Sequence, residues 1–387
     1  MGNQSGAVVT QIAKKLLLEI GNQVSVFSFD VEDGKEEDGT ELFSRTRYNA
    51  LSNWQESKYI IEYKKVLEKS DANVIFTLGC VTNINLAYLE IARNRKIKVI
   101  SKIFMQDFFC VKFYANNTKG PCTKCLDNSY LEAFKNKCII KKPIDYVKTA
   151  NRILIIKRLE KILPKIDYVI GSTDEQISFY KKFGVLKEKC IKIPLFFDHN
   201  RLRKIKPVMG NYFVCIAQNR IEKGFHYLKD ILSHLDSSLR IVVAYNNAEQ
   251  AKIAIERYGF QKFIDNGLME VKYDLQWGSG LADLVAKSRG VIIPSIWPTT
   301  TEFALLESLG YKKPVFCFDV GIHHEKIVNN VNGFITEVGN TKNMANQLKQ
   351  INEDTISFKQ ISKGAELLYQ ELTDWDNWKN KLKFMGL

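Results

Sequence analysis

The sequence predicts an α/β protein with two doubly wound parallel sheets, one in each half of the chain. Short apolar runs rich in β-branched residues alternate with segments of helical periodicity almost throughout. Apolar strands that alternate with helices are typical of parallel sheets covered by helices on both faces. A chain of 387 residues is also longer than one ordinary hydrophobic core accommodates. We therefore expect two domains of ordinary size.

In the first half, five runs have the composition of strands: 23–29, 73–78, 98–104, 168–172 and 191–196. Helical periodicity lies between them, for example in residues 7–21, where Ile12, Leu16 and Ile20 share one face. A doubly wound domain usually opens on a buried strand, whereas this chain opens on a helix. We therefore expect the first strand of this domain to be missing.

The second half has six strand-like runs, at 211–217, 239–245, 269–275, 290–295, 314–319 and 333–338. The segment 198–210 between the halves is polar and ends in a proline and a glycine, which is typical of a linker. The pattern therefore predicts a first domain in residues 1–197 and a second domain that begins at residue 198.

Composition places the chain among soluble globular proteins, with 45% hydrophobic and 26% charged residues. No apolar run approaches the ~18 residues that a membrane-spanning helix needs. The N-terminal segment lacks the pattern of a signal peptide. Eight cysteines in a chain of this length do not make a disulfide scaffold. We therefore expect a cytoplasmic protein.

Positive charge is concentrated in one region of the chain. The net charge is +13, and residues 102–166 alone hold 14 basic and 5 acidic residues. A local excess of this kind indicates an anionic partner. Nucleic acid and the anionic cytoplasmic leaflet of a membrane are the two candidates.

Residues 298–308, PTTTEFALLES, join a predicted strand to a predicted helix. Ligands of open α/β sheets bind beyond the carboxyl ends of the strands, at the starts of helices. In one interpretation Thr299 and Glu302 form a capping box, and Glu307 is a surface residue. In the other, the threonine hydroxyls and free amides bind a phosphate, and Glu307 accepts hydrogen bonds from a diol such as ribose.

Four cysteines form a second candidate site: Cys110, Cys122, Cys125 and Cys138. The CTKC spacing is that of a pair of metal ligands, and four thiolates can close a structural zinc site. The alternative is four reduced, partly buried thiols.

The basic segment 151–165 that follows is apolar around much of its circumference. It either lies in solvent as a basic helix or touches lipid, with its lysine and arginine stems along the apolar surface.

The stretch 294–335 resembles the nucleotide-binding signature of retaining GT-B glycosyltransferases, particularly glycosyltransferase family 4. Four further stretches resemble that family in chain order: the acceptor-side turn at 104–110, the last strands of the N-terminal domain at 167–198, the first strand and phosphate loop at 213–228, and the returning helix at 375–382. The resemblance covers nearly the whole chain.

The resemblance implies two Rossmann-like domains that face each other across a cleft. The acceptor-binding domain would comprise residues 1–197, with a cysteine-rich basic insertion at about 105–166, and a returning helix at 373–387. The nucleotide-sugar domain would comprise residues 198–372. Three parts of this sequence match functional parts of the family. Glu307 matches the glutamate that holds the ribose, and Lys223 matches the lysine that pairs with the diphosphate. The segment from Gly321 to His324 matches the loop that closes on the sugar and phosphates.

This sequence departs from the family pattern at three positions. The first glutamate of the family's pair falls on Thr299, and Glu302 is the nearest replacement. The usual arginine falls on Gln218, with Arg220 nearby, and the usual histidine before Asp107 is Gln106. The predicted catalytic residues are accordingly Glu302, Asp107 and Lys223. The predicted nucleotide-sugar-binding residues are Gln218, Arg220, Lys223, Thr299, Thr300, Thr301, Glu302, Glu307, Gly321 and His323.

The implied function is transfer of a hexose-type sugar from a UDP-, GDP- or ADP-sugar, with retention and without a catalytic metal. The implied acceptor is a glycan or lipid-linked sugar in the biosynthesis of a cell-surface polysaccharide such as O-antigen, lipopolysaccharide or capsule. The basic first domain would make peripheral contact with the cytoplasmic face of the inner membrane, with no nucleic acid bound. The alternative is an inactive scaffold whose zinc-stapled basic module binds nucleic acid or a partner protein.

Overall fold

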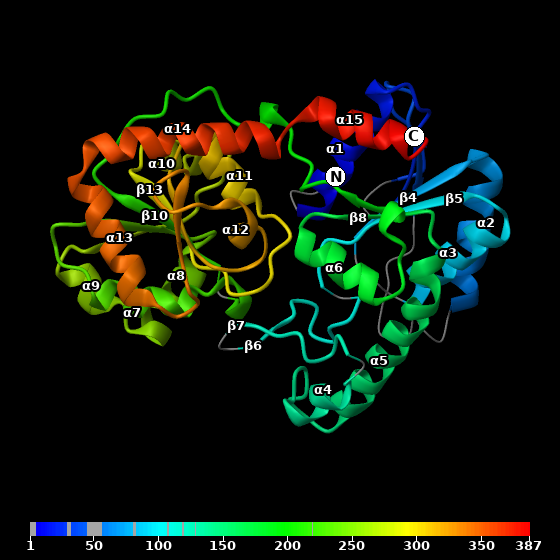
Figure 1. The fold of residues 1–387 in the computed structure, drawn as a ribbon, viewed down its shortest axis with the longest axis horizontal. Helices are drawn as coiled ribbons and strands as arrows, with labels where there is room; N and C mark the ends of the chain where they lie inside the picture. Colours follow the sequence, from blue (N-terminus) through cyan, green and yellow to red (C-terminus); the bar gives the residue numbers. More distant parts are fainter. Residues whose placement is uncertain are drawn as a thin grey trace. The chain divides into compact units, whose positions relative to one another are not determined.

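The computed structural model describes residues 5–28, 32–44, 56–79, 83–106, 108–117, 120–127, 129–218 and 220–387 (Figure 1). The chain divides into two compact units. Unit 1 comprises Met1–Phe113, Thr123–Phe196 and Asp374–Leu387, and unit 2 comprises Tyr114–Cys122 and Phe197–Thr373. The sequence placed the whole cysteine-rich insertion in the first domain, whereas residues 114–122 of it belong to unit 2.

Unit 1 contains a four-stranded parallel sheet and a smaller three-stranded sheet. The larger sheet has the order β4(Val74–Leu78), β5(Lys98–Lys102), β8(Tyr168–Gly171), β9(Cys190–Lys192). The smaller has the order β1(Ser25–Ser28), β3(Glu41–Ser44), β2(Gly34–Lys35). The predicted strand at 23–29 therefore forms, as β1, but it pairs with β3 instead of joining the four-stranded sheet.

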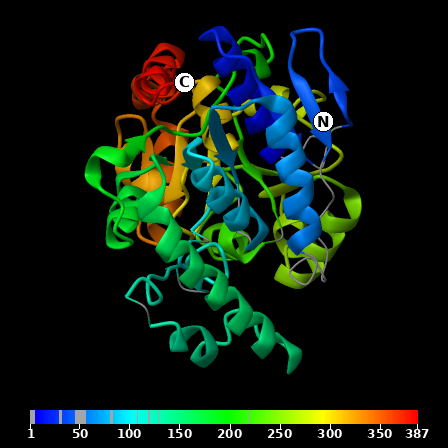
Figure 2. The same cartoon turned by 90° about the vertical axis from the view of Figure 1, so that its right-hand side faces the viewer.

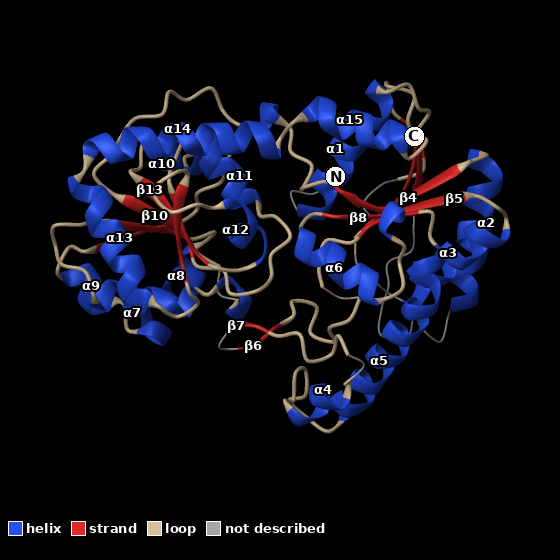
Figure 3. Ribbon diagram, in the orientation of Figure 1, coloured by secondary structure: helices blue, strands red, loops and turns tan. Residues whose placement is uncertain are grey.

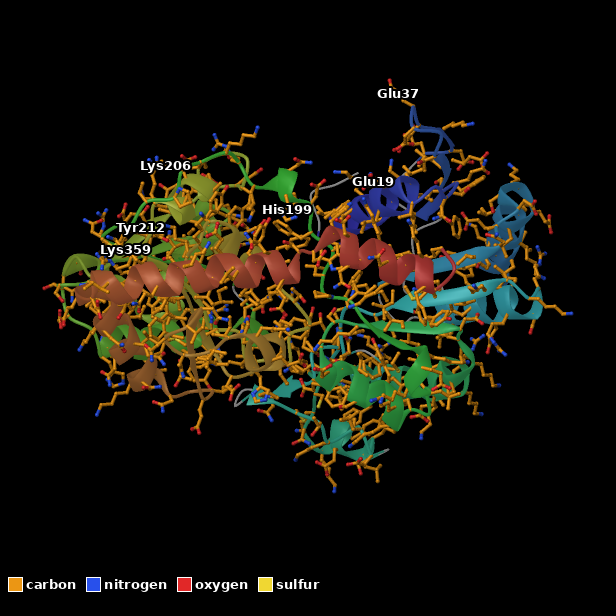
Figure 4. All side chains as sticks on the ribbon, turned by 45° about the horizontal axis from the view of Figure 1, so that its top comes forward. Glu19, Glu37, His199, Lys206, Tyr212 and Lys359 are labelled. Carbon is orange, nitrogen blue, oxygen red and sulfur yellow. The ribbon has the colours of Figure 1, made fainter. Side chains whose placement is uncertain are left out.

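The described helices of unit 1 are α1(Ser5–Glu19), α2(Glu56–Ser70), α3(Asn83–Asn94), α4(Leu131–Lys135), α5(Ile144–Ile162), α6(Asp174–Lys182) and α15(Trp375–Phe384) (Figures 1 and 2). The last of these, α15, lies against α1. Glu19 of α1 is labelled in Figure 4. Trp375 Nε1 donates a hydrogen bond to its Oε2 at 2.7 Å, and Lys379 Nζ lies 2.8 Å from the same oxygen. The ring of buried Trp378 packs edge-on against Phe196. These contacts attach the end of the chain to unit 1.

Unit 2 is built on a six-stranded parallel sheet that carries all six predicted strands. They are β10(Phe213–Ile216), β11(Ile241–Ala244), β12(Met269–Lys272), β13(Gly290–Ile293), β14(Val315–Phe318) and β15(Gly333–Thr336). Every residue of β11, β13 and β14 is buried, as expected for strands with helices on both faces (Figure 3). The order is β12-β11-β10-β13-β14-β15. Strands β11 and β12 lie on one side of β10, and strands β13, β14 and β15 lie on the other. The boundary between β10 and β13 is therefore the switch point of the sheet, where ligands of doubly wound sheets bind.

The helices of unit 2 are α7(Leu228–Ser233), α8(Ala248–Tyr258), α9(Gln261–Asp265), α10(Leu281–Ala286), α11(Phe303–Gly310), α12(Gly321–Lys326), α13(Thr341–Glu353) and α14(Thr355–Leu372). Residues 114–122 add a two-stranded hairpin, β6(Asn116–Asn117) and β7(Gly120–Pro121). None of the helices in the described residues is long and apolar enough to cross a membrane.

The predicted linker, 198–210, is held against unit 2 by backbone and side-chain hydrogen bonds. The amide of Val208 donates to the carbonyl of Ala286 at 3.0 Å. Buried Lys313 donates through Nζ to the carbonyls of Val208 and Ser288, at 2.7 and 2.8 Å. A single buried ammonium therefore joins the linker to the turn that precedes β13.

Replacing this ammonium should destabilise unit 2. Lys313→Met keeps an unbranched apolar stem but leaves two carbonyl groups without their donor, and we expect a loss of about 2–4 kcal/mol of unfolding free energy. Lys312→Met is the matched control, because Lys312 is half-exposed and its ammonium forms a surface ion pair with Glu366. Thermal unfolding of both variants measures the difference, and equal melting temperatures would contradict this role of Lys313.

Candidate functional site

A glycine brings the loop after β10 against the segment after β13. The 3-10 turn Ile221–Lys223 ends at Gly224, which has a φ of 65° in the left-handed region. A Cβ atom on Gly224 would lie 1.7 Å from the carbonyl oxygen of Pro294. Only glycine permits this approach. The side chain of Lys223 is thereby placed beside the residues that lead into α11.

Lys223 forms an ion pair with Glu302 across this junction. Its Nζ lies 3.3 Å from Glu302 Oε2, and only 6% of the glutamate side chain is exposed. The same Nζ lies 5.6 Å from the centroid of the Trp297 ring, within range of a cation–π contact. The lysine itself keeps 22% of its side chain exposed. One end of the pair is therefore buried, and the other can be reached from solvent.

The predicted capping box is not formed. Helix α11 begins at Phe303, so Glu302 is its N-cap residue, and its side chain makes no capping hydrogen bond. Thr299 lies three residues outside the helix, and its carbonyl oxygen instead accepts a hydrogen bond from the Ile322 amide at 2.8 Å. The capping interpretation was wrong because the helix starts three residues later than a cap at Thr299 requires. The Glu302 carboxylate is consequently available to Lys223.

Electrostatics favour an ionised Glu302. Burial acts to raise the pKa of its carboxyl, but the charge of Lys223, the electrostatic interaction with His323, and hydrogen bonds from Ser295 and Lys223 together hold the pKa below its usual value. Burial lowers the pKa of His323, and its Nδ1 lies 3.3 Å from the Phe318 carbonyl oxygen. With a neutral ring donating from Nδ1, His323 Nε2 is a hydrogen-bond acceptor.

Glu307 is a buried residue of α11, with 2% of its surface exposed. The interpretation of Glu307 as a surface residue was therefore wrong, because this face of α11 packs into unit 2. Arg201 Nη2, from the linker segment, lies 3.5 Å from its Oε1. Burial raises the pKa of the Glu307 carboxyl to about 7, and the charge and hydrogen bond of Arg201 offset this only in part.

Gly321 allows the start of α12 to pack against the threonine segment. Its φ is 49°, and a Cβ atom there would lie 2.2 Å from the Thr299 carbonyl oxygen. Thr299, Thr300 and Thr301 are all buried by this packing. The predicted residues from both loops thus lie together in unit 2.

Several buried polar atoms of this region have no hydrogen-bond partner within the part of the chain that the structure describes. They include Trp297 Nε1, Thr299 Oγ1, Glu302 Oε1, Glu307 Oε2 and His323 Nε2. Buried polar atoms are nearly always bonded, and each unpartnered one costs about 1–3 kcal/mol. A cluster of them beside a lysine at the switch point of the sheet indicates a site for a polar, anionic ligand.

Two residues that sequence reasoning missed, Tyr114 and Arg201, also belong to this region. The guanidinium of exposed Arg220, a predicted residue, pairs with Glu222 and with the hydroxyl of Tyr114, and it stacks on the Tyr114 ring at 4.8 Å. Tyr114 packs edge-on against Trp297, with ring centroids 5.4 Å apart. Tyr114 is far from both residues in the sequence, so no local pattern signals these contacts. Arg201 was missed for the same reason.

Gln218, predicted to bind the nucleotide sugar, is exposed on the loop after β10. Asp107, predicted as catalytic, lies outside the described residues, and its neighbour Gln106 is buried in unit 1.

The four cysteines predicted to bind zinc form no disulfide with any described residue; Cys110 and Cys125 are buried, and Cys122 and Cys138 are partly buried. Among the described residues, no group of three or more histidine, cysteine, aspartate or glutamate side chains is placed to hold a metal ion. Cys122 ends the segment assigned to unit 2, whereas the other three belong to unit 1. The structure gives the zinc site no support, so zinc stays a prediction from the sequence.

Comparison with known proteins identifies the class. Sucrose-phosphate synthase from Thermosynechococcus elongatus aligns with a TM-score of 0.70 and 12% identity over 99% of this chain and 93% of that chain. HepE of Anabaena, in complex with UDP and glucose, aligns with a TM-score of 0.66 and 15% identity over 98% and 96%. WaaG, a glycosyltransferase involved in lipopolysaccharide biosynthesis, aligns with a TM-score of 0.61 and 11% identity over 96% and 95%.

These alignments show that the chain has the fold of GT-B glycosyltransferases. No curated protein sequence matches it. Residues 197–367 match the model of the family described as glycosyl transferases group 1. The matched segment comprises nearly all of unit 2, which carries the cluster of unpartnered polar atoms.

The raised pKa of Glu307 predicts a pH-dependent cost of keeping it buried. Between its ordinary pKa of 4.5 and about 7, the folded protein holds a proton that the unfolded chain has lost. The contribution to stability is therefore fully present below pH 4.5 and is lost as the pH rises through 7. Glu307→Gln cannot ionise, so we expect it to gain stability relative to wild type between about pH 5 and 8, by about 1–3 kcal/mol.

Unfolding measured at the two ends of that range gives the difference. Glu256→Gln, at an exposed position of α8, is the matched control and should show no such gain. A Glu307→Gln protein whose stability follows wild type at every pH would contradict the burial of an ionisable carboxyl at this position.

Proposed function

We propose that this protein is a glycosyltransferase that transfers a sugar from a nucleoside diphosphate donor. The observation that carries the proposal is the cluster of buried, unpartnered polar atoms beside Lys223, at the switch point of the sheet in unit 2. Nucleotides bind doubly wound sheets at this place. The match of residues 197–367 to the glycosyl transferases group 1 family supports a sugar nucleotide over other nucleotides.

The donor is bound through its diphosphate and its ribose. Lys223 supplies a cation that can be reached from solvent, and the free amides at the start of α11 add partial positive charge. Arg220 is exposed on the same loop and adds a second cation. Glu307 offers its unpartnered Oε2 and the Oε1 that faces Arg201 to the two ribose hydroxyls. HepE was solved with UDP and with UDP-glucose, so uridine nucleotides are the first to test.

The sugar is held by the polar groups between Trp297 and His323. Thr299 occupies the place of the usual carboxylate and cannot supply a negative charge. Glu302 replaces it: its ionised carboxylate has one oxygen paired with Lys223 and one unpartnered. Thr299 Oγ1 and His323 Nε2 complete a set of donors and acceptors for sugar hydroxyls.

The reaction proceeds with retention of configuration. The bond between the anomeric carbon and the diphosphate oxygen breaks, and the acceptor oxygen bonds to the same face of the sugar. The proton of the acceptor hydroxyl passes to the departing diphosphate. Lys223 and the α11 amides stabilise the charge that develops on the diphosphate, and no metal ion is needed for that neutralisation. The acceptor is a glycan or lipid-linked sugar of a cell-surface polysaccharide; the likeness to WaaG supports this class.

Binding of nucleoside diphosphates tests the proposal directly. Calorimetric titration with UDP, GDP and ADP should show binding of one of them at micromolar to sub-millimolar affinity. Glu307→Ala should weaken that binding about tenfold or more, because the ribose hydroxyls lose a charged acceptor. Glu256→Ala, on exposed α8, is the control. If the wild-type protein binds none of the three, the glycosyltransferase proposal fails and the inactive scaffold stands.

Turnover of the Glu302→Gln variant tests the role of that carboxylate. Glutamine has the same shape without the charge, so we expect kcat to fall by a factor of tens or more while the melting temperature moves little. The assay uses whichever nucleotide sugar the wild-type protein turns over. Wild-type kcat in the variant would show that Glu302 does not act on the sugar.

A further inference from the structure

The hairpin segment 114–122 belongs to unit 2, although the chain on both sides of it belongs to unit 1. Its two strands, β6 and β7, are labelled in Figure 1. A Cβ atom on Gly120 would lie 3.4 Å from Cγ1 of Val338, which follows β15. Tyr114, the first residue of the segment, contacts Arg220 on the loop after β10. The segment therefore lies against the carboxyl edge of the sheet in unit 2, where the candidate site is.

Tyr114 and Trp297 form an aromatic pair that contacts both cations of the candidate site. Their rings meet edge to face, with centroids 5.4 Å apart and planes at 90°. The Arg220 guanidinium lies 4.8 Å from the centroid of the Tyr114 ring, and Lys223 Nζ lies 5.6 Å from that of the Trp297 ring. A cation–π contact restrains a long side chain and leaves its positive charge in place. Both positive groups are therefore held beside one aromatic pair and keep their charge for an anion.

Tyr114 also orients the guanidinium of Arg220 through its hydroxyl, which accepts a hydrogen bond from Arg220 Nη2. The arginine side chain is 49% exposed, and it also pairs with Glu222. A long arginine side chain carries about 2 kcal/mol of rotamer entropy, part of which is lost when it binds a ligand. A side chain that is already oriented loses less, so the same contact yields a higher affinity.

We propose that Tyr114 is a positioning residue of the donor site, which holds Arg220 so that its guanidinium binds the donor diphosphate together with Lys223. This inference rests on the proposed function. It gives a role in donor binding to a segment that the sequence placed in the acceptor-binding domain. Tyr114 acts through the arginine and does not itself contact the ligand.

Calorimetric titration of the full chain with UDP, GDP and ADP tests the inference. Tyr114→Leu removes the ring and the hydroxyl, and it should weaken binding of the preferred nucleoside diphosphate about fivefold, because Arg220 loses both contacts that orient it. Tyr114→Phe keeps the ring and should weaken binding by no more than about twofold. Arg220→Lys changes no aromatic residue and keeps the charge, but it lacks the planar guanidinium, so it too should weaken binding about fivefold.

A double-mutant cycle distinguishes positioning from a structural role. Arg220→Met should weaken binding about tenfold, because the diphosphate loses a charged donor. Tyr114→Leu combined with Arg220→Met should weaken it no further than Arg220→Met alone, since the tyrosine acts through the guanidinium. A tyrosine that only stabilised the fold of unit 2 would instead give two losses that multiply.

Matched controls lie at the opposite, amino edge of the same sheet. Arg240, before β11, is 49% exposed like Arg220 and also pairs with one glutamate, Glu270. Tyr212, before β10, is partly buried like Tyr114, and its hydroxyl donates to the carbonyl of Leu284 at 2.9 Å. Arg240→Met and Tyr212→Leu should bind the nucleotide like wild type.

The outcomes separate this inference from the proposed function. If the wild-type protein binds none of the three nucleotides, the proposed function fails and the inference fails with it. If the wild-type protein binds one of them and both Tyr114→Leu and Arg220→Lys bind it equally well, the inference alone is overturned. It is also overturned if the losses of Tyr114→Leu and Arg220→Met multiply in the double variant.

Discussion

The ion pair between Lys223 and Glu302 joins the two loops on either side of the switch point in unit 2. It exists because Gly224 allows the first loop to approach the carbonyl of Pro294 at a distance that no side chain would permit. The pair places a cation at the edge of a buried region where an anion can reach it. It also keeps a carboxylate ionised in surroundings that would otherwise favour its protonated form. The other features of the site depend on this contact, because it sets how closely the loop after β10 meets the start of α11.

The candidate site lowers the folding stability of unit 2. Unpartnered atoms of Trp297, Thr299, Glu302, Glu307 and His323 are buried in a unit whose sheet is otherwise densely packed. Such groups persist only where the surrounding structure is rigid enough to hold them. The parallel sheet supplies that rigidity, since every residue of its strands β11, β13 and β14 is buried. A polar ligand that satisfies these atoms would recover part of the cost, which is a physical reason for the region to bind one.

Periodicity predicted all six strands of unit 2, because buried parallel strands read as uninterrupted apolar runs. The position of segment 298–308 between a strand and a helix predicted Glu302 and Glu307 as ligand-binding residues, and the family resemblance predicted Lys223; the structure places all three in unit 2. Spacing did not locate the start of α11, where tertiary contacts to Thr299 override the local capping signal. Nor did it find Arg201 or Tyr114, whose partners are about a hundred residues away. The sequence of α5 shows no clear amphipathic pattern, because apolar residues lie on both faces of the helix. The structure shows which of the two faces is buried in unit 1.

The central claim is that Lys223 binds an anionic ligand, and that it pairs with Glu302 when no ligand is bound. Calorimetric affinity for the preferred nucleoside diphosphate, without its sugar, tests this claim through two variants. Lys223→Met should weaken binding about tenfold or more, because the diphosphate loses a cation. Glu302→Gln should leave the affinity unchanged or raise it, because the ligand no longer competes with a carboxylate for the lysine. If both variants weaken binding to the same extent, the ion pair serves to hold the loops in place, and the claim is contradicted.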